Sequence, residues 1–61
     1  MTKLKNLFIE LVKIELSNYE LISDNIRFNT IKFYAEMIPF NNIPLSEWIL
    51  ICNENQIKSN N

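Results

Sequence analysis

Two long segments of this chain carry apolar side chains around more than half of a helix circumference, and the chain contains no glycine. At about 100° per residue, each of these segments, residues 2–18 and 25–37, has an apolar arc about 220° wide. A helix on the surface of an ordinary domain shows an apolar stripe only a little over about 100° wide. We therefore expect both segments to be helices that are covered by neighbours on two sides.

A chain of 61 residues is short for burying so much apolar surface by itself. A domain of this size buries about 60% of the surface that its unfolded chain exposes, and ordering entropy nearly cancels the gain. The single cysteine, Cys52, cannot close an internal disulfide, and the absence of histidine excludes a Cys/His zinc site. The remaining support for the fold is oligomerisation or binding to another protein.

Capping residues and prolines divide the chain into helices. Thr2 is a candidate N-cap of the first helix, and Ser23 or Asp24 is a suitable N-cap of the second. Pro39 ends the second helix, because the residue before a proline is pushed out of the helical region. A strand over residues 26–34 is an alternative, since Ile, Phe, Thr and Tyr are good strand formers, but the regular alternation of a strand is broken there.

A third and shorter helix follows a connector. Residues 40–44 combine asparagines and a proline, which form turns, and Ser46 then looks like the N-cap of a helix over residues 47–55. We expect residues 58–61 to fray, because their side chains have nothing to bury. The sequence thus predicts one all-α domain over residues 1–57, a helical hairpin with a short third helix, which is completed by dimerisation or by a partner.

The apolar arcs can be divided between a seam inside the domain and a face for a partner. Trp48 is a candidate anchor of the partner face, because tryptophan is enriched among residues that dominate binding energy. A core position is the alternative for Trp48, since so small a core needs its largest side chain. The predicted seam comprises Leu4, Leu7, Leu11, Ile26, Phe33 and Met37. The predicted partner face comprises Ile9, Leu16, Phe28 and Ile31 at the arc edges, together with Trp48.

Two charged residues, Glu15 and Arg27, fall inside the apolar arcs of the first and second helices. A charge that is buried among apolar side chains needs a partner. A pair formed by Glu15 and Arg27, within one chain or across a dimer, would satisfy both groups. The alternative is that both long side chains reach out to solvent.

The residue content argues against catalysis and against nucleic acid. Six Lys and Arg stand against seven Asp and Glu, and no face gathers the basic residues that bind phosphates. No glycine is present for a phosphate-binding loop and no histidine is present to activate Cys52, so we expect no enzyme, no cofactor and no metal. A small helix-turn-helix DNA-binding regulator is the alternative, although the connector is long for that motif and the third helix is acidic.

The sequence therefore predicts how the protein acts, by packing against another protein, and not the pathway in which it acts. The longest apolar run, five residues from Trp48 to Cys52, is far shorter than the roughly 20 that cross a membrane, and acidic residues weaken the further alternative of a membrane-surface helix. We expect a cytoplasmic, non-catalytic protein–protein interaction module, a small regulator, adaptor or inhibitor that binds a second copy or a larger protein. Abundant Asn and Ile with a single Ala point to AT-rich coding, as in a phage, a plasmid or a low-GC genome.

Overall fold

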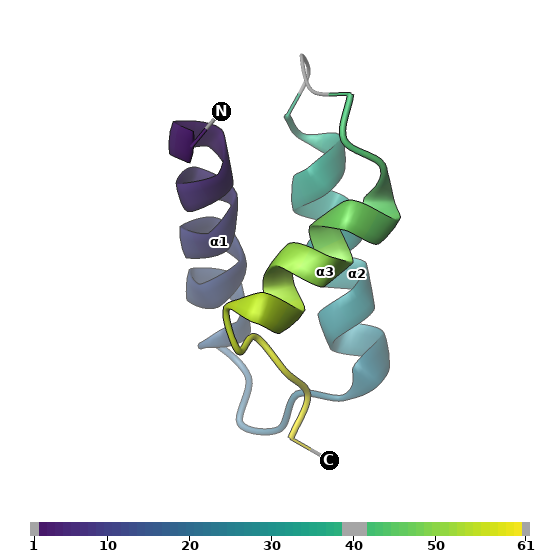
Figure 1. Ribbon diagram of the computed structural model, residues 1–61. Helices are drawn as coiled ribbons and strands as arrows, with labels where there is room; N and C mark the ends of the chain where they lie inside the picture. The colour runs from purple at the N-terminus through teal and green to yellow at the C-terminus, as the bar shows by residue number, and fades with distance from the viewer. Residues whose placement is uncertain (1, 39–41, 61) are drawn as a thin grey trace.

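Three α-helices form the fold in a computed structural model, which describes residues 2–38 and 42–60. Helix α1 spans Thr2–Leu16, α2 spans Asp24–Glu36 and α3 spans Leu45–Glu54. Helices α1 and α2 run antiparallel, and α3 crosses one side of this hairpin (Figure 1). The described residues contain no strand, and residues 26–34 are helical. The predicted all-α, three-helix architecture is confirmed.

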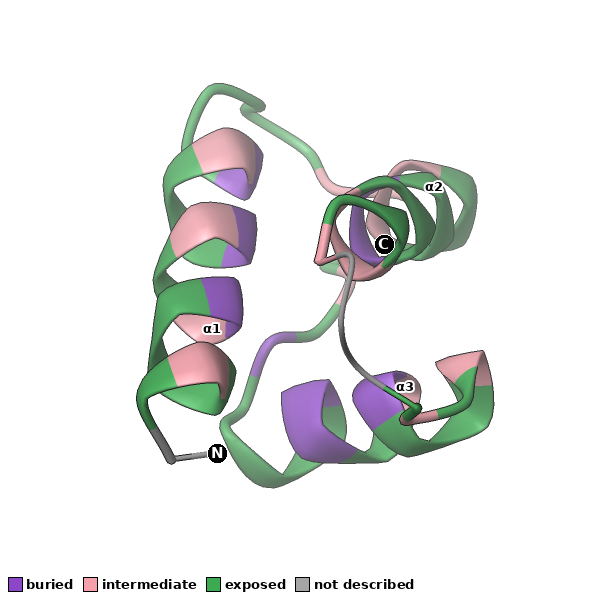
Figure 2. Ribbon diagram, turned by 90° about the horizontal axis from the view of Figure 1, so that it is seen from above, coloured by how far each residue is buried: buried purple, intermediate pink, exposed green. Residues whose placement is uncertain are grey.

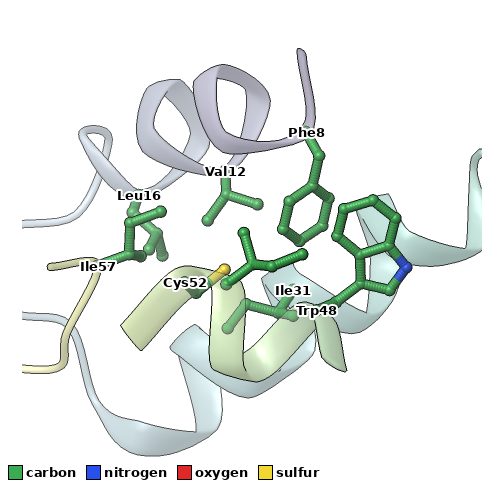
Figure 3. Close-up of a cluster of buried hydrophobic side chains, with 8 residues drawn as sticks. Phe8, Val12, Leu16, Ile31, Trp48, Cys52 and Ile57 are labelled. Carbon is green, nitrogen blue, oxygen red and sulfur yellow. The ribbon is translucent and has the colours of Figure 1, made fainter. Parts of the chain in front are cut away.

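The core lies between the hairpin and α3. Buried apolar side chains from all three helices and from the segment after α3 fill it (Figure 3). The two largest, Phe8 and Trp48, place their ring centroids 4.2 Å apart with planes inclined by 39°. In Figure 2 the buried parts of α1 and α3 are turned toward the interior, and their outer sides are exposed. The other members of the core are Val12, Leu16, Ile31, Ile51, Cys52 and Ile57.

The amount of surface that remains exposed is ordinary for the size of the chain. The accessible surface is 4439 Å², close to the roughly 4,200 Å² that a folded monomer of this mass exposes. Helix α3 and the segment after it thus cover part of the apolar surface that the sequence predicts to be covered by a second chain. The remaining peculiarity is the position of the exposed apolar side chains.

The start of α2 agrees with the sequence. Ser23 is its N-cap, with extended backbone, and the Ser23 Oγ accepts a hydrogen bond of 3.1 Å from the backbone N–H of Ile26. Asp24 lies in the first turn, where a carboxylate interacts favourably with the helix dipole. The predicted helix stop at Pro39, the connector residues 40–41 and the side chain of Thr2 lie outside the described residues.

The start of α3 differs from the prediction. Pro44 occupies the N-cap position with φ −69° and ψ 159°, no side chain caps the helix, and Ser46 lies inside its first turn. The carbonyl of Pro44 accepts from the N–H groups of Glu47 and Trp48. Leu45 is partly buried against the core, and the helix therefore begins at Leu45, before the serine that the sequence predicts as its N-cap.

Helix α3 ends in a turn that normally contains glycine. Gln56 has φ 62°, in the left-handed region that is unfavourable for a residue with a Cβ atom. The N–H of Ile57 donates to the carbonyl of Cys52 over 2.9 Å, and that of Gln56 donates to the carbonyl of Asn53 over 3.2 Å. These bonds are those of a Schellman motif, whose usual apolar contact is supplied by Ile57 and Cys52. The turn directs Ile57 back into the core.

The C-terminal segment is held more firmly than the free tail that the sequence predicts. The Nε of Arg27 on α2 donates to the carbonyl of Ile57 over 2.7 Å. The N–H of Asn60 donates to the carbonyl of Ile22 over 2.9 Å, and the N–H of Ile22 donates back to the Asn60 side chain. The prediction of a frayed tail rested on the absence of apolar side chains to bury. Hydrogen bonds from polar groups attach the segment to the α1–α2 connection instead. Asn61 lies outside the described residues.

Candidate interaction surface

Five large apolar side chains in the described part of the chain are more than half exposed. One of them, Leu21, lies in the α1–α2 connection, and the other four lie on α1 or at the C-terminal end of α2. Leu7 and Ile14 on α1 are 52% and 62% exposed; Phe33 on α2 and Met37, the C-cap residue of α2, are 58% and 56% exposed. Their spacings, seven residues on α1 and four on α2, keep each pair on one side of its helix. We call these four residues the outer face.

The contact between Glu15 and Tyr34 shows on which side of the hairpin the outer face lies. The Tyr34 hydroxyl donates to the Glu15 carboxylate over 3.3 Å, so these two residues mark the seam between α1 and α2. Around α1, the core residue Val12 lies on the α3 side of Glu15, and Leu7 lies on the other side. Around α2, the core residue Ile31 lies on the α3 side of Tyr34, and Phe33 lies on the other side. The outer face therefore lies on the side of the hairpin opposite α3.

A hollow of about 380 Å³ opens at the seam and continues the outer face at Phe33. The rings of Phe33 and Tyr34 stand edge to face, with centroids 5.1 Å apart. Burial, and secondly the negative charge of Glu15, raise the pKa of the Tyr34 hydroxyl above its usual value. That usual value already lies well above neutral pH, so the hydroxyl is a donor at neutral pH. The lining residues are Glu15, Tyr19, Ile26, Asn29, Thr30, Phe33 and Tyr34.

The structure does not gather the five residues predicted to bind a partner. Leu16, Ile31 and Trp48 are at most 4% exposed and belong to the core, so they present no surface in this fold. Ile9 is half-buried against the core, and Phe28 is 42% exposed on α2. The core position considered for Trp48 as the alternative is the one observed.

The structure also places the predicted seam residues differently from the prediction, because none of the six lies in the buried core. Leu7, Phe33 and Met37 are exposed, whereas Leu4, Leu11 and Ile26 are half-buried. Both edges of each arc are apolar, and nothing in the local pattern indicates from which side α3 approaches. The hollow also contains Tyr19 and Asn29, which the sequence assigned to no site.

Glu15 and Arg27 have different partners within the chain. Glu15 accepts from Tyr34, whereas Arg27 donates to the carbonyl of Ile57 and, through a terminal N–H, to the side-chain oxygen of Asn53. Both partners of Arg27 lie in α3 or just after it. The sequence does not indicate that this distant part of the chain packs next to Arg27. A pair between Glu15 and Arg27 across a dimer stays a prediction.

Cys52 is a buried, unpaired cysteine at the centre of the core. Burial raises the pKa of its thiol to about 11, although the positive charge of Arg27 acts in the opposite direction. The thiol is therefore protonated at neutral pH, and thiolate is the form that reacts. Cys52 packs as a small apolar side chain.

Other kinds of site find no support in the described residues. No group of three or more His, Cys, Asp or Glu side chains there is placed to hold a metal ion. No helix in the same part of the chain is long and apolar enough to span a bilayer. Comparison with protein-family models, with curated proteins and with solved structures found no match. The outer face and its hollow are the features from which a function can be argued.

Proposed function

We propose that this protein is a non-catalytic protein–protein interaction module that binds through the outer face. The exposure of that face carries the proposal: four large apolar side chains, each more than half exposed, lie on the one side of the hairpin that α3 leaves open. Apolar residues scattered singly over a surface need no explanation, whereas apolar residues gathered on one side are typical of contact sites.

The free energy available from the outer face supports a contact of modest affinity. Complete burial of a Leu, Ile, Phe or Met side chain is worth about 1.5–3 kcal/mol, so covering the exposed half of four such side chains yields roughly 3–6 kcal/mol. A matching apolar surface on the partner about doubles this favourable free energy. Association also costs roughly 4–15 kcal/mol, because both molecules lose translational and rotational freedom. The outer face can therefore hold a partner, but a tight complex needs additional polar contacts.

The partner is a second copy of the chain or a larger protein. Either choice fits a small cytoplasmic regulator, adaptor or inhibitor, and the Asn- and Ile-rich composition fits an origin in a phage, a plasmid or a low-GC genome. The solution mass of the protein over a concentration series, by sedimentation or light scattering, distinguishes self-association from a requirement for another protein.

The experiment compares the wild-type protein with a double variant, Leu7→Ser with Phe33→Ser. Leu50→Ser serves as the matched control, because Leu50 is 48% exposed but lies on α3. We expect the wild-type protein to associate, or as a monomer to bind a dye that reports apolar surface. The double variant should lose both properties at unchanged helix content, and the control should keep them. A wild-type monomer that binds no dye at any concentration would contradict the proposal.

The helix-turn-helix alternative receives less support. Residues 37–44 separate α2 from α3, and α3 carries Glu47 and Glu54 without a single Lys or Arg. Phosphate-backbone binding needs such cations. We expect the protein to cause no mobility shift of duplex DNA at physiological salt. A mobility shift that weakens steeply with added salt would instead favour the helix-turn-helix DNA-binding regulator.

A further inference from the structure

The hollow beside Phe33 contains a carboxylate whose hydrogen-bonding capacity is largely unused. Glu15 is half-buried in its wall, and within the described part of the chain the Tyr34 hydroxyl, at 3.3 Å, is the one hydrogen-bond partner of its carboxylate. A good O–H···O bond measures about 2.5–3.0 Å, and an ionised carboxylate offers about four acceptor positions. Arg27, the cation considered for Glu15, is bound instead to Ile57 and Asn53.

Aromatic rings line the same hollow. Tyr19 and Phe33 are 42% and 58% exposed, and Tyr34 stands edge to face with Phe33. A guanidinium or ammonium group within about 6 Å of a ring centroid is attracted to the face of that ring. A carboxylate surrounded by aromatic rings is therefore suited to an organic cation, and arginine fits better than lysine because its planar fork can bond the carboxylate twice while it stacks on a ring.

A second copy of the chain does not supply this cation from the corresponding surface. A two-fold dimer presents the same patch from both subunits. The residues of the outer face and of the hollow include no Lys or Arg, and the titratable groups among them are Glu15, Tyr19 and Tyr34. Two copies joined face to face would add a second carboxylate rather than a positive charge.

We propose that the hollow binds an arginine side chain presented by an amphipathic helix of a different protein, whose apolar side covers the outer face. This inference rests on the proposed function and adds the chemistry of the partner. The volume of about 380 Å³ lies at the lower end of ligand-sized pockets and suits one long side chain. The charged contact supplies the polar interaction that the apolar face needs for affinity.

The first experiment tests the hollow without any partner. Ethylguanidinium, an analogue of the arginine head group, and ethylurea, its neutral counterpart, are titrated into the protein and followed by NMR. We expect saturable shifts at Tyr19, Phe33 and Tyr34 with the cation alone. Glu15→Gln should weaken binding about tenfold, as expected for the loss of a charge-assisted hydrogen bond. Glu10→Gln, at an exposed position of the same helix, should leave it unchanged.

The second experiment tests the helix. Two amphipathic helical peptides are identical except for arginine or citrulline at the centre of the apolar side. We expect the arginine peptide to bind the wild-type protein about tenfold more tightly, and the difference to vanish in Glu15→Gln but persist in Glu10→Gln.

The outcomes separate this inference from the proposed function. Equal binding of the two peptides, with no localised shift by ethylguanidinium, overturns the arginine site and leaves docking on the outer face intact. A localised shift by ethylguanidinium without binding of either peptide overturns the helical partner and counts against the outer face as a docking surface. The absence of both effects overturns both proposals.

Discussion

The rings of Phe8 on α1 and Trp48 on α3 lie against each other, with centroids 4.2 Å apart, and neither residue is more than 1% exposed. This contact joins the first and the last helix across the core, next to Ile31 of α2 (Figure 3). Because α3 covers one side of the hairpin only, the contact fixes which side of α1 becomes the interior and which becomes the outer face.

Phe8→Ala is expected to unfold the chain. Removing a buried Phe side chain costs about 3–5 kcal/mol, and a single core of this size rarely supplies more than about 3–5 kcal/mol in total. Circular dichroism at 25 °C should show the loss of most helix. Leu50→Ala, at an exposed position of α3, is the matched control and should keep the wild-type melting curve. A Phe8→Ala protein that melts like the wild type would place the core elsewhere.

Arg27→Gln is expected to lower the free energy of unfolding by about 1–3 kcal/mol, because the Ile57 carbonyl and the Asn53 side chain both lose their donor. Urea denaturation in double-mutant cycles provides the measurement. Arg27 should be coupled to Asn53 and, in dilute protein, uncoupled from Glu15, since the hydrogen bonds of these two side chains go to different partners. Coupling to Glu15 that appears only at high protein concentration would instead identify the pair across a dimer.

Gln56→Gly is expected to stabilise the protein by about 1 kcal/mol, because glycine adopts the left-handed conformation of this turn without a Cβ penalty. For a domain of this size that gain raises the melting temperature by roughly 4–8 °C. Asn55→Gly is the control, since Asn55 has φ −100° and its side chain bonds the Ile51 carbonyl. Thermal denaturation should show opposite shifts for the two variants, and a destabilised Gln56→Gly protein would argue against the turn.

The stability of the fold is expected to decline in alkaline solution through Cys52. The folded chain binds the thiol proton more tightly than the unfolded chain, because the folded-state pKa is about 11. Stability from this group is therefore complete below about pH 9 and is lost as the pH rises to 11. Cys52→Val should flatten the decline in urea denaturation over this range. Tyr34→Phe separates the further contribution of Tyr34, whose pKa is also raised.

Local chemistry in the sequence was sufficient to predict the helices, and insufficient to predict their faces. Ser23 caps α2 as expected, and both wide arcs are helical. Leu7 and Leu16 are equally apolar members of one arc, yet one is 52% and the other 4% exposed. The difference depends on the approach of α3, which is set by contacts between residues distant in the chain, such as Phe8 with Trp48.

The C-terminal segment escaped prediction for a related reason. In a chain without glycine, nothing marks Gln56 as the residue that reverses the backbone after α3. Arg27 finds its hydrogen-bond partners only once that reversal has occurred. The hollow with Glu15 likewise requires the packing of α1 on α2, so its lining residues share no pattern in the sequence.

The most direct test of the outer face is the attenuation of methyl signals by a soluble paramagnetic probe, measured by NMR in dilute protein and again in the associated state. Leu7, Ile14 and Met37 should be strongly attenuated in dilute protein and recover on association, whereas Leu50 should stay attenuated and Leu16 and Ile31 should be protected throughout. The account would be contradicted if Leu7, Ile14 and Met37 were protected in dilute protein, or if they stayed attenuated after association while other methyl groups became protected.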